Sequence, residues 1–284
     1  MRQKDKFVEL FNLFIKKNRT KLASNTLYNY DVTRRKIENF LPDITIREVD
    51  EDFVQEYILH YKHNKNTTLK KDISTTRKVL EWAFRKGIIS RMPLIDFKLP
   101  EEEPIRTYLL KSELKKLIKF YEETELPPGM ENSLKLFLFS CFTGLRYSDA
   151  INLRPENLTE DDDGNKFIRI PQKKTKRIVM VPLHPTAEEL LELDQKTRRF
   201  FKWQRVQVVN KNLKKIAQRC GIDKNLSTHV ARHTFAMLSL QAGMDLQAIQ
   251  SFLGHRRITT TQIYAKLLPE AKMKEFQKLK KFLE

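Results

Sequence analysis

Residues 227–264 read STHVARHTFAMLSLQAGMDLQAIQSFLGHRRITTTQIY, and they contain three signals for the start of a helix. Ser227 or Thr228 can cap a first helix, because a hydroxyl at that position accepts hydrogen bonds from unpaired backbone N–H groups. Asp245 can cap a second helix and Thr259 a third. Glycines follow the first two helical patterns, as is usual at helix ends. The stretch therefore predicts three consecutive helices.

The segment that precedes this stretch predicts a mixed but mostly helical unit. Residues 112–123 have the spacing of an amphipathic helix, and residues 134–142 are so apolar that a helix there is expected to be buried on most sides. The helix is expected to resume with Leu134 after a break at the Pro-Pro-Gly sequence 127–129. Two short apolar runs, 167–170 and 177–181, are typical of a small β-hairpin.

The first hundred residues predict a separate bundle of helices. Apolar residues recur at helical spacing in four segments, which begin near Phe7, after Ser24, near Asp50 and near Asn66, and Leu27, Ile37, Phe40 and Leu41 are expected to face inward in the second. Gly87 can end the fourth helix in a left-handed conformation. We predict a mainly α protein with an N-terminal domain at 1–98, a linker at 99–106 and a second domain at 107–284.

The charge of the chain points to a polyanionic partner. Lys and Arg number 54 and Asp and Glu 36, which makes the formal net charge +18. Residues 1–100 hold 21 basic and 13 acidic side chains and the remainder 33 and 23, so both domains are basic. A solvated charged surface is the alternative, but it must then explain a positive excess along the whole chain. Nucleic acid is the first candidate partner.

Cysteine usage and hydropathy bear on the compartment. Cys141 and Cys220 are the two cysteines and lie far apart, which supports neither a disulfide scaffold nor a cysteine-based zinc site. The N-terminus leads into an amphipathic segment, and no 18-residue apolar run occurs in the sequence. We therefore expect a cytoplasmic protein that has no membrane association.

Several segments of the second domain present residues that suit the handling of a phosphate. In chain order these residues are Arg146, Lys174, His229, Arg232, His255 and Tyr264. A phosphodiester gains negative charge on its nonbridging oxygens when a nucleophile attacks, so preorganised cationic donors lower the barrier. The guanidinium fork suits this best, because it can hold two phosphate oxygens and stays protonated. Each segment is a weak signal alone, and the ordered set carries the prediction.

This ordered set resembles the signature of the tyrosine recombinase or phage integrase family, which reads Arg, Lys, His-x-x-Arg, His or Trp, and Tyr. Tyr264 follows His255 by nine residues within a Leu-Gly-His … Ile-Tyr frame like that of the family. The likeness extends over nearly the whole chain. It implies a SAM-like core-binding domain at the N-terminus and a catalytic domain after it.

The resemblance implies a role for each residue. Arg146 and Arg232 would clamp the phosphate, and Tyr264 would be the nucleophile that forms a 3′-phosphotyrosyl link. His229 would be the base and His255 a hydrogen-bond donor to the phosphate, although either could share the proton transfer. The resemblance further implies that Asp149, the acidic residue three positions after the first Arg, supports the site. It also implies that neither a metal nor a cofactor is needed.

Two assignments in this set stay open. Lys174 would protonate the departing 5′ oxygen, because it stands seven residues before Val181 as in the family frame, but Lys173 and Lys176 are close rivals. His229 and His233 stand four apart on one predicted helix, a spacing that can hold a metal, but no acidic third ligand stands at a recognisable offset. The resemblance makes His233 a buried packing residue.

The function that the resemblance implies is site-specific DNA recombination. Four protomers, each a monomer when free, would exchange strands of two duplexes through a Holliday junction, with an accessory DNA-bending protein as a possible partner. An apolar pattern at about 270–284 indicates a docking helix, which would pack on a neighbouring protomer or on its own core. The alternatives are a type IB topoisomerase and a DNA-binding protein with a decayed site. Integrase, invertase, resolvase and transposon recombinase all fit this sequence.

Overall fold

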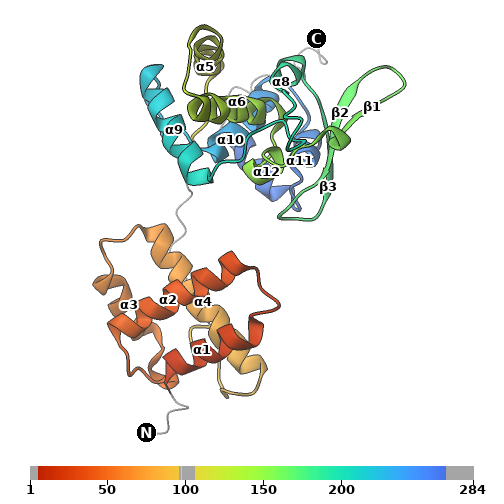
Figure 1. The fold of residues 1–284 in the computed structure, drawn as a ribbon. Coiled ribbons are helices and arrows are strands. Elements are labelled where there is room, and N and C mark those ends of the chain that lie inside the picture. The colour runs from red at the N-terminus through yellow and green to blue at the C-terminus, as the bar shows by residue number, and fades with distance from the viewer. Residues whose placement is uncertain (1–5, 96, 98–105, 267–284) are drawn as a thin grey trace, which may run out of the picture. The chain divides into compact units, whose positions relative to one another are not determined.

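The chain folds into two compact units, residues 1–103 and 104–284, each with its own hydrophobic core. The computed structural model describes residues 6–95, 97 and 106–266, which Figure 1 shows as a coloured ribbon. Both units are mainly helical, and the second also contains a small sheet, so the predicted fold class is confirmed. Within the described ranges, no helix is long and apolar enough to cross a lipid bilayer.

The first unit is built from four helices, α1 (Phe7–Asn18), α2 (Ser24–Phe40), α3 (Glu51–His60) and α4 (Asn66–Arg85), with a short 3-10 turn, η2 (Ile46–Glu48). All four predicted starts are confirmed. The Asp50 carboxylate caps α3 by accepting a hydrogen bond from the Phe53 N–H. Gly87 follows α4 with a φ of 68°, the left-handed conformation that its position predicts.

The core of the first unit lies where α1, α2 and α4 pack together. Phe7 and Phe11 on α1 are fully buried, and Leu80 on α4 packs in the same cluster. One predicted core residue, Leu41, is 36% exposed. The reason is that α2 ends at Phe40, so the backbone at Leu41 has left the helical conformation and its side chain leaves the buried face.

The second unit contains eight helices in the range 106–266. They are α5 (Lys111–Glu123), α6 (Pro128–Thr143), α7 (Tyr147–Ala150), α8 (Pro185–Glu189), α9 (Val206–Arg219), α10 (Thr228–Gln241), α11 (Leu246–Leu253) and α12 (Thr259–Lys266), with a 3-10 turn, η3 (Pro155–Asn157). A break is present at residues 124–127, but the expectation that the helix resumes at Leu134 is wrong, because α6 begins at Pro128. Proline fits the first turn of a helix, where its missing N–H has no partner to lose.

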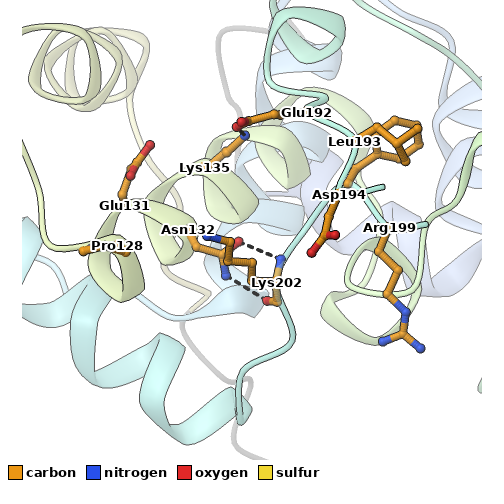
Figure 2. Close-up of a pocket in the computed structure, with 10 residues that line it drawn as sticks. Pro128, Glu131, Asn132, Lys135, Glu192, Leu193, Asp194, Arg199 and Lys202 are labelled. Carbon is orange, nitrogen blue, oxygen red and sulfur yellow. Dashed lines mark hydrogen bonds and ion pairs between the residues drawn. The ribbon is translucent and has the colours of Figure 1, made fainter. Parts of the chain in front are cut away.

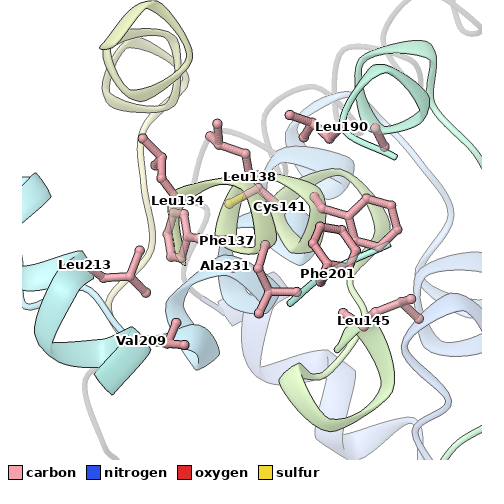
Figure 3. Close-up of a cluster of buried hydrophobic side chains, with 14 of the residues drawn as sticks. Leu134, Phe137, Leu138, Cys141, Leu145, Leu190, Phe201, Val209, Leu213 and Ala231 are labelled. Atoms are coloured by element: carbon pink, nitrogen blue, oxygen red, sulfur yellow. The ribbon is translucent and has the colours of Figure 1, made fainter. Parts of the chain in front are cut away.

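Helix α6 runs through the middle of the second unit and carries its core. Figure 3 shows Leu134, Phe137 and Leu138 of α6 within one cluster that also holds Leu213 of α9 and Ala231 of α10. Nearly every side chain of α6 from position 132 onward is buried, which confirms the prediction of a helix covered on most sides. This packing provides the rigid frame on which α7 and α10 are mounted.

The sheet has three antiparallel strands, β1 (Leu158–Glu160), β2 (Lys166–Pro171) and β3 (Ile178–Pro182), in that order. The predicted hairpin corresponds to β2 and β3, in which Ile168 pairs with Val181 and both side chains are buried. Strand β1 was not predicted, because three residues are too few to show an alternating pattern. Figure 1 shows the sheet beside α11, so that the β2–β3 turn lies near the end of that helix.

The last three helices follow the prediction from residues 227–264. Ser227 stands at the N-cap of α10, and the Asp245 carboxylate caps α11 through the Gln247 N–H. Gly254 ends α11 in the left-handed conformation, with a φ of 60°. The docking helix predicted at about 270–284 and most of the linker predicted at 99–106 lie outside the described residues.

Candidate active site

The candidate residues come from five segments of the second unit. Arg146 precedes α7, Lys174 lies in the β2–β3 turn, His229 and Arg232 are on α10, His255 follows α11, and Tyr264 is on α12. These segments surround one region, because Arg146, Arg232 and Lys174 all act electrostatically on His229, and Arg232 acts on Tyr264.

Arg232 is the most deeply buried charge of the group. Its side chain donates to the Gly144 carbonyl at 2.7 Å and to the Leu253 carbonyl, which ties α10 to the ends of α6 and α11. Burial lowers the pKa of Arg232 to about 9, so the guanidinium is cationic at neutral pH. The two carbonyls hold it in place before any anion arrives, which is the preorganisation that charge stabilisation requires.

Arg146 is held from the side by a glutamine that the sequence analysis did not select. Its guanidinium donates to the Gln172 side-chain oxygen, while the Gln172 amide donates to the Leu253 carbonyl at 3.0 Å. Gln172 is fully buried and also accepts from the Thr175 hydroxyl. Gln172 directly follows β2 and lies 26 residues after Arg146, so the sequence around Arg146 could not reveal this partner.

Asp149 lies beneath Arg146 as a buried carboxylate. One oxygen accepts a hydrogen bond from the Lys173 backbone N–H at 2.9 Å, which ties α7 to the β2–β3 turn. The other lies 4.0 Å from the Arg146 guanidinium and has no hydrogen-bond partner among the described residues. Burial lowers the pKa of Arg146, and the charge of Asp149 opposes this shift without cancelling it.

Tyr264 is only 2% exposed, and its ring packs with Phe235, Ile249 and Leu253. Burial raises the pKa of its hydroxyl, while the charges of Arg232 and Arg106 act in the opposite direction. The phenol is therefore protonated at neutral pH and needs a proton acceptor if it is to attack.

His233 is the side chain that reaches this hydroxyl. Its Nδ1 lies 2.8 Å from the Tyr264 oxygen, and the two rings are 5.7 Å apart. Burial lowers the pKa of His233 to about 4, so the ring is neutral. His233 packs against the Tyr264 ring, as the packing role predicts, and in addition makes a polar contact with the candidate nucleophile, which was not predicted. That contact joins α10 to α12 across 31 residues, so helical spacing could not reveal it.

Arg106 is a second residue that the sequence analysis missed. It was placed at the end of the predicted linker, yet its charge acts on Tyr264, His233 and His255. It is part of the second compact unit, which begins at residue 104. Arg106 lies two residues after Pro104 and belongs to no recognisable motif, so the sequence did not indicate that it is a site residue.

The remaining histidines face the same region. His255 Nδ1 lies 2.9 Å from the hydroxyl of Thr261, a fully buried side chain on α12, and this contact orients the ring. Burial, with the charges of Arg232 and Arg146, lowers the pKa of His255 to about 3. Burial also lowers the pKa of His229. All three imidazoles are therefore neutral at pH 7 in the free chain.

The three candidate lysines occupy different places in the β2–β3 turn. Lys173 is held through its backbone by Asp149, and Lys176 closes the turn with a φ of 59° and a hydrogen bond to the Gln172 carbonyl. Lys174 is exposed, and its charge lowers the pKa of His229. Within the described residues, no cluster of three or more His, Cys, Asp or Glu is arranged around a common point.

Replacing Gly254 with Ala is expected to disturb this site by displacing the Gln172 side chain. A Cβ at Gly254 would lie 2.5 Å from the Gln172 side-chain oxygen, in addition to the strain of a left-handed alanine. We expect a loss of about 2–4 kcal/mol in the free energy of unfolding, measured with urea. Gly221→Ala is the matched control, since its φ is 62° but nothing lies within 4 Å, and it is expected to cost about 1 kcal/mol. Equal losses in the two variants would contradict the role given to Gln172.

The half-buried His255 predicts that the protein loses stability in acid. The unfolded chain binds a proton at His255 below its ordinary pKa of 6.5, whereas the folded chain does so near 3, so the free energy of unfolding falls as the pH drops through this window. We expect His255→Gln to reduce the slope of stability against pH near pH 5 by about 1 kcal/mol per pH unit. Urea titrations at several pH values measure this, and an unchanged slope would show that His255 is not buried as a neutral ring.

Comparison with known proteins assigns the chain to a family. Residues 107–271 match the phage integrase family, and residues 6–99 match the phage integrase SAM-like domain. The chain belongs to the phage integrase family. Members of this family of tyrosine recombinases are enzymes that cleave and rejoin DNA through a tyrosine, and the chain is an enzyme of this class.

Individual relatives agree with this assignment. A tyrosine recombinase of Pseudothermotoga lettingae is 29% identical over 86% of both chains, and tyrosine recombinase XerD of Lacticaseibacillus casei is 28% identical over 87% of this chain and 89% of its own. Two solved structures share the fold. The XerH site-specific recombinase bound to palindromic difH has a TM-score of 0.74 at 19% identity and covers 95% of this chain and 84% of its own. A lambda integrase dimer bound to a COC′ core site has a TM-score of 0.71 at 18% identity, and the match covers 90% of this chain and 76% of the integrase chain.

Proposed function

We propose that the chain carries out site-specific DNA recombination with Tyr264 as the nucleophile and Arg146 and Arg232 as the phosphate clamp. The observation that carries this proposal is that the buried Tyr264 hydroxyl lies against His233 and within the field of Arg232, while Arg232 acts together with Arg146 and Lys174 on His229. A type IB topoisomerase is not favoured, because the relatives are recombinases.

The proposed step exchanges one phosphodiester for another. The Tyr264 oxygen attacks the phosphorus, the bond from phosphorus to the 5′ oxygen breaks, and a 3′-phosphotyrosyl link and a free 5′ hydroxyl result. Because the energy of the bond is kept in the phosphotyrosyl link, a 5′ hydroxyl of the partner strand can reverse the step. Arg146 and Arg232 stabilise the charge that develops on the nonbridging oxygens.

The proton leaves the phenol through a neutral imidazole. His229 is the proposed base in the complex with DNA, because burial and the charges of Arg232, Lys174 and Arg146 lower its pKa and so keep the ring neutral and able to accept a proton. His233 holds the hydroxyl in the free chain through its 2.8 Å contact and can share this transfer. His255, oriented by Thr261, is proposed to donate a hydrogen bond to a phosphate oxygen.

Lys174 is proposed as the acid that protonates the departing 5′ oxygen. All three lysines of the turn are exposed, and Lys174 is the one whose charge lowers the pKa of His229. The backbone N–H groups of Lys173 and Lys176 are bonded to Asp149 and Gln172. Asp149 is proposed to support this arrangement, since it links Arg146 to the backbone of the turn.

The proposed partner is double-stranded DNA. The net charge of +18 and the exposed cations of both units suit a polyanion, and binding is then expected to weaken steeply with salt. We further propose a core-binding role for the domain at 1–98, catalysis by the domain at 107–284, a tetramer on two synapsed duplexes, and docking of the segment 270–284 on a neighbouring protomer. An accessory DNA-bending protein is a further proposed partner.

A recombination assay separates this function from its alternatives. Selection from duplexes of random sequence first supplies a bound site, which is then placed twice, with distinguishable flanks, on one supercoiled plasmid. We expect exchange of the flanks, without ATP or added metal. Relaxation of plasmids that lack the site would favour a topoisomerase, and binding with neither reaction would favour a DNA-binding protein with a decayed site.

A further inference from the structure

The second unit contains a long stretch of one charge sign. Residues 195–222 include nine Lys and Arg and no Asp or Glu. The stretch comprises the loop before α9 and the helix itself. None of the nine cations forms an ion pair with another described residue, and most are exposed. Such a stretch attracts a polyanion.

Trp203 stands out in this stretch because its side chain is 63% exposed. Its neighbour Phe201 is 2% exposed and packs on Phe139 with a ring distance of 5.0 Å, so the chain turns outward between these two aromatic residues. Lys202 and Arg205, which flank the indole, are exposed as well. A large exposed aromatic among unpaired cations is a typical composition for a nucleic-acid contact.

The backbone around Trp203 is held firmly, although the indole is not. Asn132 of α6 makes two hydrogen bonds to the backbone of Lys202, donating to its carbonyl at 2.9 Å and accepting from its N–H at 3.0 Å, as Figure 2 shows. The Gln204 side chain accepts from Asn132 and Ser133 and donates to the Gly129 carbonyl at 2.8 Å. Residues on both sides of the tryptophan are therefore anchored to α6, and the indole is presented on a rigid support.

This support is connected to the phosphate clamp. The Tyr147 hydroxyl donates to the Gln204 carbonyl, and Tyr147 is the residue that follows Arg146. One hydrogen bond thus links the residue after the exposed indole to the residue after a proposed catalytic arginine. A partner that seats on Trp203 is positioned relative to Arg146.

We propose that Trp203, with Lys202 and Arg205, is a DNA contact that sets the position of the duplex relative to Arg146. The proposal rests on the proposed function and adds a positioning residue to it. The indole packs on sugar or base edges while the two cations pair with phosphates. DNA is favoured over a second copy of this chain, because a second copy brings its own +18 charge to a face that is already cationic.

Fluorescence of the indole tests the contact directly. The chain has two tryptophans, and Trp82 packs edge-on against Phe14 in the first unit, so Trp82→Phe leaves Trp203 as the only tryptophan. We expect a saturating duplex of random sequence to reduce acrylamide quenching of Trp203 by about two-fold or more, because contact removes the indole from water. Anisotropy of a labelled duplex confirms binding in the same sample.

Two outcomes would overturn the proposal. One is a bound duplex with unchanged quenching of Trp203. The other is protection that appears without DNA and grows with protein concentration, which would assign the indole to a second copy. Neither outcome removes the covalent Tyr264 adduct, so failure here is distinguishable from failure of the proposed function.

Salt dependence gives an independent readout. Trp203→Ala is expected to weaken binding by about ten-fold without changing the slope of log affinity against log salt, because it removes an apolar contact. Lys202→Gln and Arg205→Gln are each expected to lower that slope by about 1. Leu110→Ala, which removes a side chain 47% exposed in the second unit, is the control. Affinity unchanged by Trp203→Ala, with a normal melting curve, would contradict the proposed contact.

Discussion

Replacing Tyr264 with Phe is expected to abolish the covalent protein–DNA adduct while leaving DNA binding intact. The variant lacks only the hydroxyl, and the ring keeps its packing with Phe235, Ile249 and Leu253. The lost hydrogen bond to His233 costs about 1 kcal/mol of stability, which a folded domain tolerates. A nicked suicide duplex carrying the selected site traps the adduct, and a denaturing gel measures it.

Tyr121→Phe is the matched control for this experiment. Tyr121 is a partly buried tyrosine on α5 of the same unit, and burial raises the pKa of its hydroxyl as it does for Tyr264. Tyr121→Phe is expected to form the adduct at the wild-type rate. An adduct that persists in Tyr264→Phe would place the nucleophile on another residue and contradict the proposed mechanism.

Replacing Arg232 with Ala is expected to slow adduct formation by about 10³-fold or more at saturating DNA, because a preorganised charge next to the phosphate is lost. The same change removes the side-chain donor to the Gly144 carbonyl and one of the two donors to the Leu253 carbonyl, which keeps the Gln172 amide. We therefore also expect a loss of about 1–3 kcal/mol in the free energy of unfolding. Single-turnover kinetics below the unfolding transition measure the chemical step separately from folding.

Arg232→Lys separates charge from geometry in this experiment. A lysine keeps the positive charge but cannot replace the planar fork that spans two carbonyls, so we expect an intermediate rate. Arg154→Ala removes an arginine paired with Glu156 away from the site and is expected to change neither quantity. A chemical step near the wild-type rate in a folded Arg232→Ala would show that this arginine does not act on the phosphate.

The secondary structure was largely predictable because its signals are local. Caps at Asp50 and Asp245 and the periodic apolar residues of α1 to α4 act within one or two turns of helix. The two exceptions have separate causes. Strand β1 is too short to show an alternating pattern, and the prolines before Leu134 were read as a break although Pro128 fits the first turn of α6.

The types and the order of residues along the sequence were enough to identify the chemical groups of the candidate site. Arg146, Lys174, His229, Arg232, His255 and Tyr264 were selected by residue type and order, and the structure gathers their segments in one unit. Their basic surroundings were equally evident from composition. Residue type and local helix formation are properties of short stretches of sequence.

The way in which these groups are held depends on contacts between distant segments. Gln172 beneath Arg146 and His233 against Tyr264 are contacts between segments 26 and 31 residues apart. Arg106 reaches the tyrosine from the start of the second unit, and Thr261 orients His255. Such contacts arise when helices pack, and packing depends on side chains throughout the core rather than on any one motif. The reactive groups are therefore encoded locally, and their orientation and pKa values are set by the whole fold.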